Sequence, residues 1–248
     1  MRCLALAATL IAIAAPPASA SVQGWGENSH GQLGAGYRSL PQNPVGTAGL
    51  PANVKTVAAA GGTSYALLDD GTVRAWGGNT YGQLGDGTHT ASTVPVQVKI
   101  AGVTQIAASR SHVIARLSDG TVAVWGSNLN GELGNGTTTH GRETKGDNSP
   151  VPLIVPNLQG VVAVATGGPD NVALLSDGTL MAWGENGVGE VGDGTRVEKT
   201  VPTRVRGLSG VKAVAIGGFS GNGGHMLALL NDGTVRAVGG NGSGQLGD

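Results

Sequence analysis

Cysteine, aromatic residues and charge are all scarce in this chain of 248 residues. The single cysteine, Cys3, has no lipidation-type cleavage motif behind it, so the rest of the chain offers no thiol for disulfides, zinc binding or nucleophilic chemistry. Only 12% of the residues are charged and the formal net charge is −1. We expect no nucleic-acid partner, because a basic face would be needed to replace the counterions of the phosphates.

Long hydrophobic runs are absent beyond the N-terminus. No membrane span is therefore expected, because a transmembrane helix needs about 20 apolar residues. At the N-terminus, Arg2 precedes the apolar residues 4–15, and Ala18-Ser19-Ala20 follows them, which is the layout of a secretory signal peptide. We predict a signal peptide over residues 1–20, cleavage after Ala20, and a mature protein that is secreted to the extracellular space.

Glycine, by contrast, is abundant, and it recurs in a fixed pattern. Equivalent aromatic positions return roughly every 50 to 60 residues, at Trp25, Trp76, Trp125 and Trp183, with Val238 in the fifth place. A Gly-Gln/Glu-Leu/Val-Gly turn follows each of them, at residues 31–34, 82–85, 131–134, 189–192 and 244–247. Asp-Gly-Thr turns, a strong β-hairpin signal, begin at Asp70, Asp119, Asp177 and Asp232. This period indicates stacked repeats of one supersecondary unit.

One repeat contains four short β-segments separated by turns. In the second unit they are residues 54–59, 65–68, 72–76 and 94–98, and no stretch after residue 20 shows a sustained helical period. The predicted fold is all-β, a β-propeller of four-stranded antiparallel blades, with about four to five repeats present. The predicted units are residues 21–53, 54–102, 103–160, 161–210 and 211–248.

The repeat resembles that of the regulator of chromosome condensation family. The clearest copy runs from Gly61-Gly62 through Asp70-Gly71-Thr72-Val73 and Trp76-Gly77-Gly78-Asn79 to Gly82-Gln83-Leu84-Gly85-Asp86-Gly87-Thr88. The resemblance implies a propeller, usually of seven blades, so the ring formed by this chain would be incomplete. Its open edge strands would favour self-association. Relatives include a nucleotide-exchange factor for a small GTPase, secreted β-lactamase inhibitors and a plant photoreceptor with clustered tryptophans.

The sequence contains no pattern that points to catalysis, a cofactor or a metal. It has neither a Gly-x-Ser-x-Gly elbow nor a phosphate-binding loop, and the five histidines are spread over different repeats, two of them in the unit 103–160, without the spacing of metal ligands. The aspartates of the Asp-Gly-Thr turns are explained by turn chemistry. We expect His112 and His225, with Tyr65 in the same place, to pack or hydrogen-bond between blades. The tryptophans are expected in the core rather than on a carbohydrate platform.

Residues that differ between repeats are the better candidates for binding, because loops on a rigid scaffold are free to recognise partners. The polar loop 137–150 is longer than its counterpart in the preceding repeat, and residues 219–224 interrupt a Gly-Gly turn with the only Phe of the chain. Residue types that interfaces favour also occur in or beside other turns. The candidate partner-binding residues are His140, Arg142, Lys145, Phe219, Asn222, Tyr37, Tyr81 and Arg110.

These observations favour a secreted, non-catalytic protein-binding propeller that docks an extracellular protein or a cell-envelope component through its loops. One alternative is a carbohydrate-binding or hydrolytic propeller. A second alternative, which rests on family analogy alone, is an activity like that of a guanine-nucleotide-exchange factor.

Overall fold

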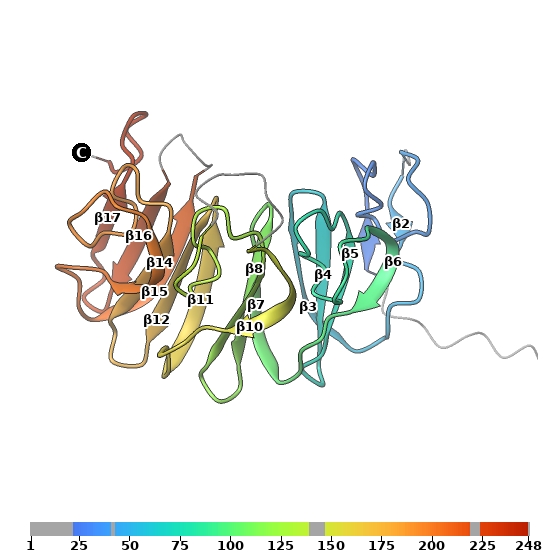
Figure 1. Cartoon of the computed structure of the whole chain (residues 1–248), viewed down its shortest axis with the longest axis horizontal. Helices are drawn as coiled ribbons and strands as arrows, with labels where there is room; N and C mark the ends of the chain where they lie inside the picture. The colour runs from blue at the N-terminus through green and yellow to red at the C-terminus, as the bar shows by residue number, and fades with distance from the viewer. Residues whose placement is uncertain (1–21, 41–42, 139–146, 219–223, 248) are drawn as a thin grey trace, which may run out of the picture.

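The computed structural model describes residues 22–40, 43–138, 147–218 and 224–247. In these ranges the chain forms β-strands and turns, arranged as five separate antiparallel sheets. Figure 1 shows the sheets side by side in chain order, from the blue N-terminal strands to the red C-terminal ones, in an arc whose two ends do not meet. The all-β propeller architecture and its open ring, both predicted from the sequence, are confirmed.

Three of the sheets are complete four-stranded units, and each runs in simple chain order from its first to its fourth strand. The first consists of β3 (Val54–Ala60), β4 (Thr63–Leu68), β5 (Val73–Gly77) and β6 (Ser92–Gln97). The second consists of β7 (Val103–Ala108), β8 (His112–Leu117), β9 (Val122–Gly126) and β10 (Ser149–Ile154). The third consists of β11 (Val161–Gly167), β12 (Asp170–Leu175), β13 (Leu180–Gly184) and β14 (Lys199–Arg204).

Smaller sheets lie at the two ends of the arc. At the N-terminal end, β1 (Gln23–Gly24) pairs with β2 (Val45–Gly46), and at the C-terminal end β15 (Val211–Gly217), β16 (His225–Leu230) and β17 (Val235–Gly239) form a three-stranded sheet. The first strands of successive units, β3, β7, β11 and β15, pack against each other and therefore form the inner edge of the arc. In the described part of the chain, no helix has the length and apolar character needed to cross a bilayer.

In each of the four sheets formed by β3 to β17, an Asp-Gly-Thr hairpin joins the second strand to the third, as predicted. In the β4–β5 hairpin, Oδ1 of Asp70 accepts hydrogen bonds from the backbone N–H and the hydroxyl of Thr72, at 2.9 and 2.7 Å. Gly71 between them has a φ of +76°, a conformation that glycine adopts without the penalty of a side chain. The same contacts recur at Asp119, Asp177 and Asp232. These hydrogen bonds hold the pKa of each carboxyl below its usual range.

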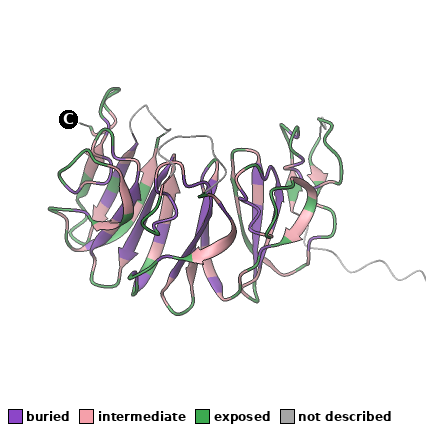
Figure 2. Cartoon of the chain, in the orientation of Figure 1, coloured by how far each residue is buried: buried purple, intermediate pink, exposed green. Residues whose placement is uncertain are grey.

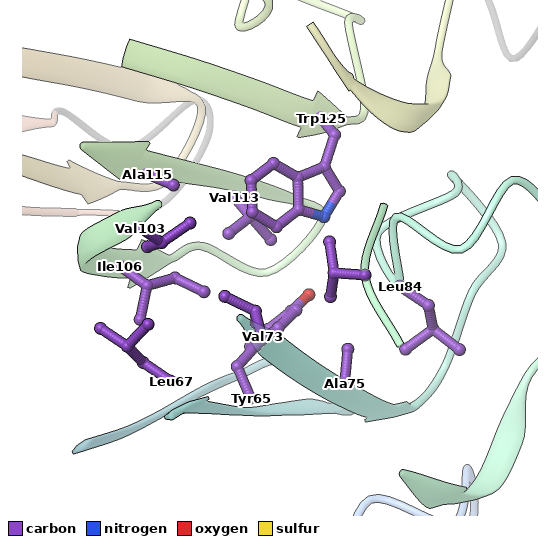
Figure 3. Close-up of a cluster of buried hydrophobic side chains, with 11 residues drawn as sticks. Tyr65, Leu67, Val73, Ala75, Leu84, Val103, Ile106, Val113, Ala115 and Trp125 are labelled. Atoms are coloured by element: carbon purple, nitrogen blue, oxygen red, sulfur yellow. The ribbon is translucent and has the colours of Figure 1, made fainter. Parts of the chain in front are cut away.

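The hydrophobic core lies between neighbouring sheets rather than within one, and Figure 2 shows buried residues along the strands of the central sheets. The cluster between the first and second full units joins Tyr65 and Leu67 of β4 to Ile106 of β7 and Trp125 of β9, as Figure 3 shows. Leu67 and Trp125 are fully buried. Because burying one large aliphatic or aromatic side chain stabilises a fold by about 1.5 to 3 kcal/mol, each unit depends on its neighbours for stability.

Buried tryptophans hydrogen-bond to the preceding unit. The indole N–H of Trp76, Trp125 and Trp183 donates to the backbone carbonyl of Gln32, Gln83 and Glu132 respectively, at 2.7, 2.9 and 2.9 Å. These three side chains are at most 2% exposed, which confirms their predicted place in the core. The glycine two positions after each carbonyl makes room for the ring: a Cβ on Gly85 would lie 2.8 Å from Nε1 of Trp125.

Trp25 is the exception, and for this residue the predicted core position is wrong. It is 71% exposed, because no described unit precedes the β1–β2 sheet and supplies the carbonyl and the apolar surface that the other tryptophans contact. Val57 on β3 is also exposed there, and at the opposite end of the arc Leu227 and Val235 are exposed. The described arc therefore presents apolar side chains at both ends.

Candidate functional site

Turns of two kinds lie at one end of each complete sheet. The inner turns join first to second strands, and the outer loops join third to fourth strands, so antiparallel geometry brings both to the same face of the arc. A cavity of about 640 Å³ opens on this face, and we call it the inner-turn cavity. From the inner turns it is lined by Gly61, Gly62, Arg110, Ser111, Gly168 and Pro169. From the outer loops it is lined by Glu27, His30, Gly78, Thr80, Tyr81, Gln83, Leu129, Asn130 and Glu132.

Recurrent residues of the outer loops hold the turns in shape. The Asn of the first four Asn-x-x-Gly turns is buried. In the first full unit Oδ1 of Asn79 accepts from the N–H of Leu84 at 2.9 Å while Nδ2 donates to the carbonyl of Thr90 at 3.1 Å. The Gln or Glu after the turn acts similarly, since Oε1 of Gln83 accepts from the N–H of Tyr81 at 2.9 Å. The repeated residues are thus accounted for by backbone hydrogen bonding.

The variable residues of the same turns line the cavity. His30, Tyr81 and Asn130 occupy one equivalent position in three successive Asn-x-x-Gly turns, and all three are lining residues. Their identities differ although the backbone around them is the same. The side chains that line the cavity therefore differ in chemical character from unit to unit, while the backbone of the turns stays the same.

Glu132 brings a buried carboxyl to the cavity wall. It takes the place that Gln83 has in the preceding unit, and its Oε2 accepts from the N–H of Asn130 at 2.7 Å. The side chain is 1% exposed, and burial raises its pKa to about 7. The carboxyl therefore changes its protonation state near neutral pH.

A second buried carboxyl, that of Asp170, begins β12 directly behind Pro169. It is 3% exposed, and neither of its oxygens has a hydrogen-bond partner among the described residues. Burial, followed by the nearby charges of Glu190, Glu185 and Glu132, raises its pKa well above the usual range. Burial of a charge without a partner is costly, so Asp170 favours its neutral form.

Two of the residues predicted for partner binding meet at the cavity. Tyr81 and Arg110, from the first and second full units, both line it. Tyr37 does not line it; the ring is 42% exposed on the outer loop of the β1–β2 sheet, and its carbonyl accepts from Nδ2 of Asn28. The other predicted residues lie outside the described part of the chain, and they are His140, Arg142, Lys145, Phe219 and Asn222.

His30, Ser111 and Asn130 were not predicted as site residues. The signal for them was present in the repeat alignment, because each occupies a position where the residue changes from unit to unit. What the sequence did not reveal is that these positions surround one cavity, which depends on how the successive sheets are packed.

His112 packs between units as predicted, although the expected equivalence with Tyr65 is wrong. The strand register pairs Thr63 with Gly77, His112 with Gly126 and His225 with Gly239, so Thr63, two residues before Tyr65, shares the histidine position. Nε2 of His112 lies 3.0 Å from Oδ1 of Asn171 in the next unit, and burial lowers the pKa of His112 to about 4. Among the described residues, no group of three or more His, Cys, Asp or Glu could hold a metal ion.

Comparison with known protein families identifies the repeat. The profile of the regulator of chromosome condensation (RCC1) repeat matches residues 70–116, 119–174 and 177–220, and a second profile of the same repeat matches residues 54–83 and 103–132. The chain belongs to the RCC1 repeat family. Together the matched ranges cover the three complete four-stranded units, and each match of the first profile begins at an Asp-Gly-Thr hairpin of one sheet and continues into the next sheet.

Characterised RCC1-repeat proteins resemble the chain over part of their length. It is 32% identical over 234 residues to the ultraviolet-B receptor UVR8 of Arabidopsis thaliana, an alignment that covers 91% of this chain and 50% of UVR8. It is 34% identical over 84 residues to the mitochondrial RCC1 domain-containing protein RUG3 of the same plant, which covers 33% of this chain and 18% of RUG3.

Solved structures give the same result for the fold. Human WBSCR16 superposes with a TM-score of 0.74 at 26% identity, covering 90% of this chain and 58% of that one. Prp20p of Saccharomyces cerevisiae, whose binding to Gsp1p and histones has been characterised, superposes with a TM-score of 0.66 at 23% identity, covering 79% and 49%. The chain thus spans about half the length of these structures, and the likeness to Prp20p concerns the fold alone.

Proposed function

We propose that the protein is a non-catalytic binding module that is secreted and docks an extracellular protein or a cell-envelope component through the face that carries the inner-turn cavity. The observation that supports this most directly is the convergence of variable positions, His30, Tyr81 and Asn130, on one cavity. Membership of the RCC1 repeat family agrees with a scaffold of this kind, because propeller repeats present loops on a rigid framework.

The composition of the cavity favours a protein ligand. Its wall is built from turns of four successive units, so that a ligand would have to be extended to contact all of them. The lining includes a tyrosine and an arginine, and these residue types are frequent among the residues that contribute most binding energy in protein interfaces. The carbohydrate alternative is less well supported, since Trp76, Trp125 and Trp183 are buried and the exposed Trp25 is not among the residues that line the cavity.

Affinity capture tests the proposal. Mature protein beginning at Ser21 would be incubated with the medium and envelope fraction of the producing cells, in parallel with a Tyr81→Ala/Arg110→Ala variant, and bound proteins identified by mass spectrometry. Arg236→Ala is the matched control, because Arg236 is an exposed arginine on the opposite face beside the β16–β17 hairpin. A third variant, which lacks residues 140–145, tests the predicted loop separately.

We expect a protein that is retained by the wild type and by Arg236→Ala and is lost from the double variant. Equal capture by all four proteins would place the binding surface elsewhere and contradict the proposal. No enrichment over bare resin would contradict the docking function itself.

Export is tested independently of binding. The predicted signal peptide requires that the product accumulate in the medium with Ser21 as its N-terminal residue, which N-terminal sequencing of the exported protein would determine. A product that keeps residues 1–20 and stays inside the cell would contradict secretion, and the partner would then have to be sought there.

A further inference from the structure

Arg110 occupies a position at which the other described inner turns have glycine. Its counterparts are Gly61 and Gly168, with φ values of +58° and +57°. Asn157 is the only non-glycine residue with a positive φ in the described part of the chain, so the turn at Arg110 follows a different path, closed by a bond from the N–H of Ser109 to the carbonyl of His112 at 2.9 Å. One inner turn therefore carries a long cationic side chain where its neighbours carry none.

The charge of Arg110 is not neutralised within the described structure. The residue is exposed. Its guanidinium forms no ion pair and no hydrogen bond with any described residue. The two acidic residues of the lining already have donors: Glu27 accepts from Nε2 of Gln32 at 2.7 Å, and Glu132 accepts from the N–H of Asn130 at 2.7 Å. Arg110 is thus the charged lining residue left to meet a ligand.

We propose that Arg110 binds a carboxylate on an Asp or Glu side chain carried by a loop of the partner protein. A guanidinium matches a carboxylate with two parallel hydrogen bonds, which gives both energy and orientation. Tyr81, half-buried on the neighbouring unit, lines the same cavity and would pack against the loop on one side of this pair. The inference rests on the proposed docking function and adds to it the chemistry of the partner.

The shape of the site favours an acidic loop over a free carboxylate. A small acid contacting Arg110 would leave most of a cavity of about 640 Å³ unfilled and would not touch the lining residues that the other units contribute. A loop fills that volume with several residues and reaches the inner turns at Gly61 and Gly168 on either side of Arg110. The carboxylate sets the register of the loop, because Arg110 attracts it and Glu27, which lines the same cavity, repels it.

A library of short random loops displayed on a neutral scaffold tests the chemistry without knowledge of the natural partner. Selection would be carried out in parallel on the wild type, Arg110→Gln, Arg110→Glu and Tyr81→Ala, with Arg236→Gln as the matched control. We expect Asp and Glu to be enriched several-fold in loops selected on the wild type and on the control. The same loops should bind Arg110→Gln about ten- to a hundredfold more weakly, as expected for a lost charge-assisted bond, and Arg110→Glu should select Lys and Arg.

The outcomes separate this inference from the proposed function. Loops that depend on Tyr81 but show no acidic preference, or that bind Arg110→Gln as well as the wild type, would overturn the carboxylate inference and leave the docking face intact. Loops whose binding is unaffected by every variant would overturn both. Competition with soluble acetate distinguishes a loop from a free carboxylate. When the protein is saturated with a selected loop, acetate should displace little of that loop. Efficient displacement by acetate would contradict a loop as the ligand.

Discussion

At the scale of single residues, one backbone carbonyl links each complete unit to the next complete unit. The carbonyl of Gln83 accepts from the indole of Trp125 and from the hydroxyl of Tyr65, both at 2.9 Å. The carbonyl of Glu132 likewise accepts from Trp183 and Asn171. Because these groups are buried, loss of one donor is not compensated by water.

Substitution of Trp125 measures this link. Trp125→Phe removes the indole N–H and part of the ring, and we expect it to lower the free energy of unfolding by about 1 to 3 kcal/mol. Trp25→Phe is the control, because Trp25 is 71% exposed, and a surface change of this kind should cost less than about 0.5 kcal/mol. Urea denaturation followed by circular dichroism compares the two. Equal losses would show that burial between units does not determine the contribution of the tryptophans.

Glu132 makes stability depend on pH. Its pKa is raised by burial from 4.5 to about 7, so the folded protein holds a proton that the unfolded chain releases. The resulting stability is fully present below about pH 4.5 and is lost as the pH rises through about 7. We expect Glu132→Gln to raise the free energy of unfolding at pH 8 by about 1 to 3 kcal/mol and to have little effect at pH 4.5.

The geometry makes this substitution a mild one, since Gln83 already fills the equivalent position and accepts the same hydrogen bond. Glu27→Gln is the control: Glu27 is exposed and the hydroxyl of Ser29 holds its pKa below the usual range. Urea titrations at several pH values would measure both variants. A Glu132→Gln variant that is no more stable at pH 8 than the wild type would contradict a buried, ionised carboxylate at this site.

At the scale of the elements, the outermost strands of the complete units combine proline with irregular pairing. β6, β10 and β14 contain Pro95, Pro152 and Pro202, and in each the register shifts at or near the proline. Proline cannot donate to a further strand, so these edges resist pairing with another sheet.

Removal of these prolines should therefore promote association. For Pro95→Val/Pro202→Val we expect an unchanged far-ultraviolet circular dichroism spectrum and a higher apparent mass in light scattering as concentration increases. Pro156→Val is the control, because Pro156 is exposed and lies outside the strands. A double variant with the mass of the wild type at all concentrations would show that the register shifts protect the edges without help from proline.

The elements were largely predictable from sequence and the site was not. Asp70-Gly71-Thr72 and the turn beginning at Gly82 determine local backbone geometry, so strand positions follow from short-range chemistry. The convergence of Tyr81 and Arg110 depends instead on the packing of two sheets, and two residues that lie in different repeats carry no local signal of it. The exposed Trp25 illustrates the same limit: its sequence context matches the buried tryptophans, and only its neighbours differ.

At the scale of the whole molecule, stability is expected to vary along the arc. A central unit is packed on both sides, whereas the β15–β17 sheet contacts a described neighbour on one side only. Leu227 of β16 is 36% exposed and Val172, at the equivalent position of β12, is fully buried. In repeat proteins each interface adds its own stabilisation, so units with one interface should open before units with two.

Hydrogen exchange followed by mass spectrometry tests this gradient. We expect amides of β16 to exchange at least about tenfold faster than those of β12, which corresponds to an opening free energy lower by about 1.4 kcal/mol. The comparison is matched, because β12 and β16 are each the second strand of their sheet and each is joined by an Asp-Gly-Thr hairpin to the third strand, with which it pairs. Equal protection of β16 and β12 in a monomer would mean that the arc opens as one cooperative unit. Equal protection that disappears on dilution would instead mean that the apolar end at Leu227 and Val235 is covered by another molecule. Sedimentation velocity before and after dilution would distinguish a monomer from such an associated species.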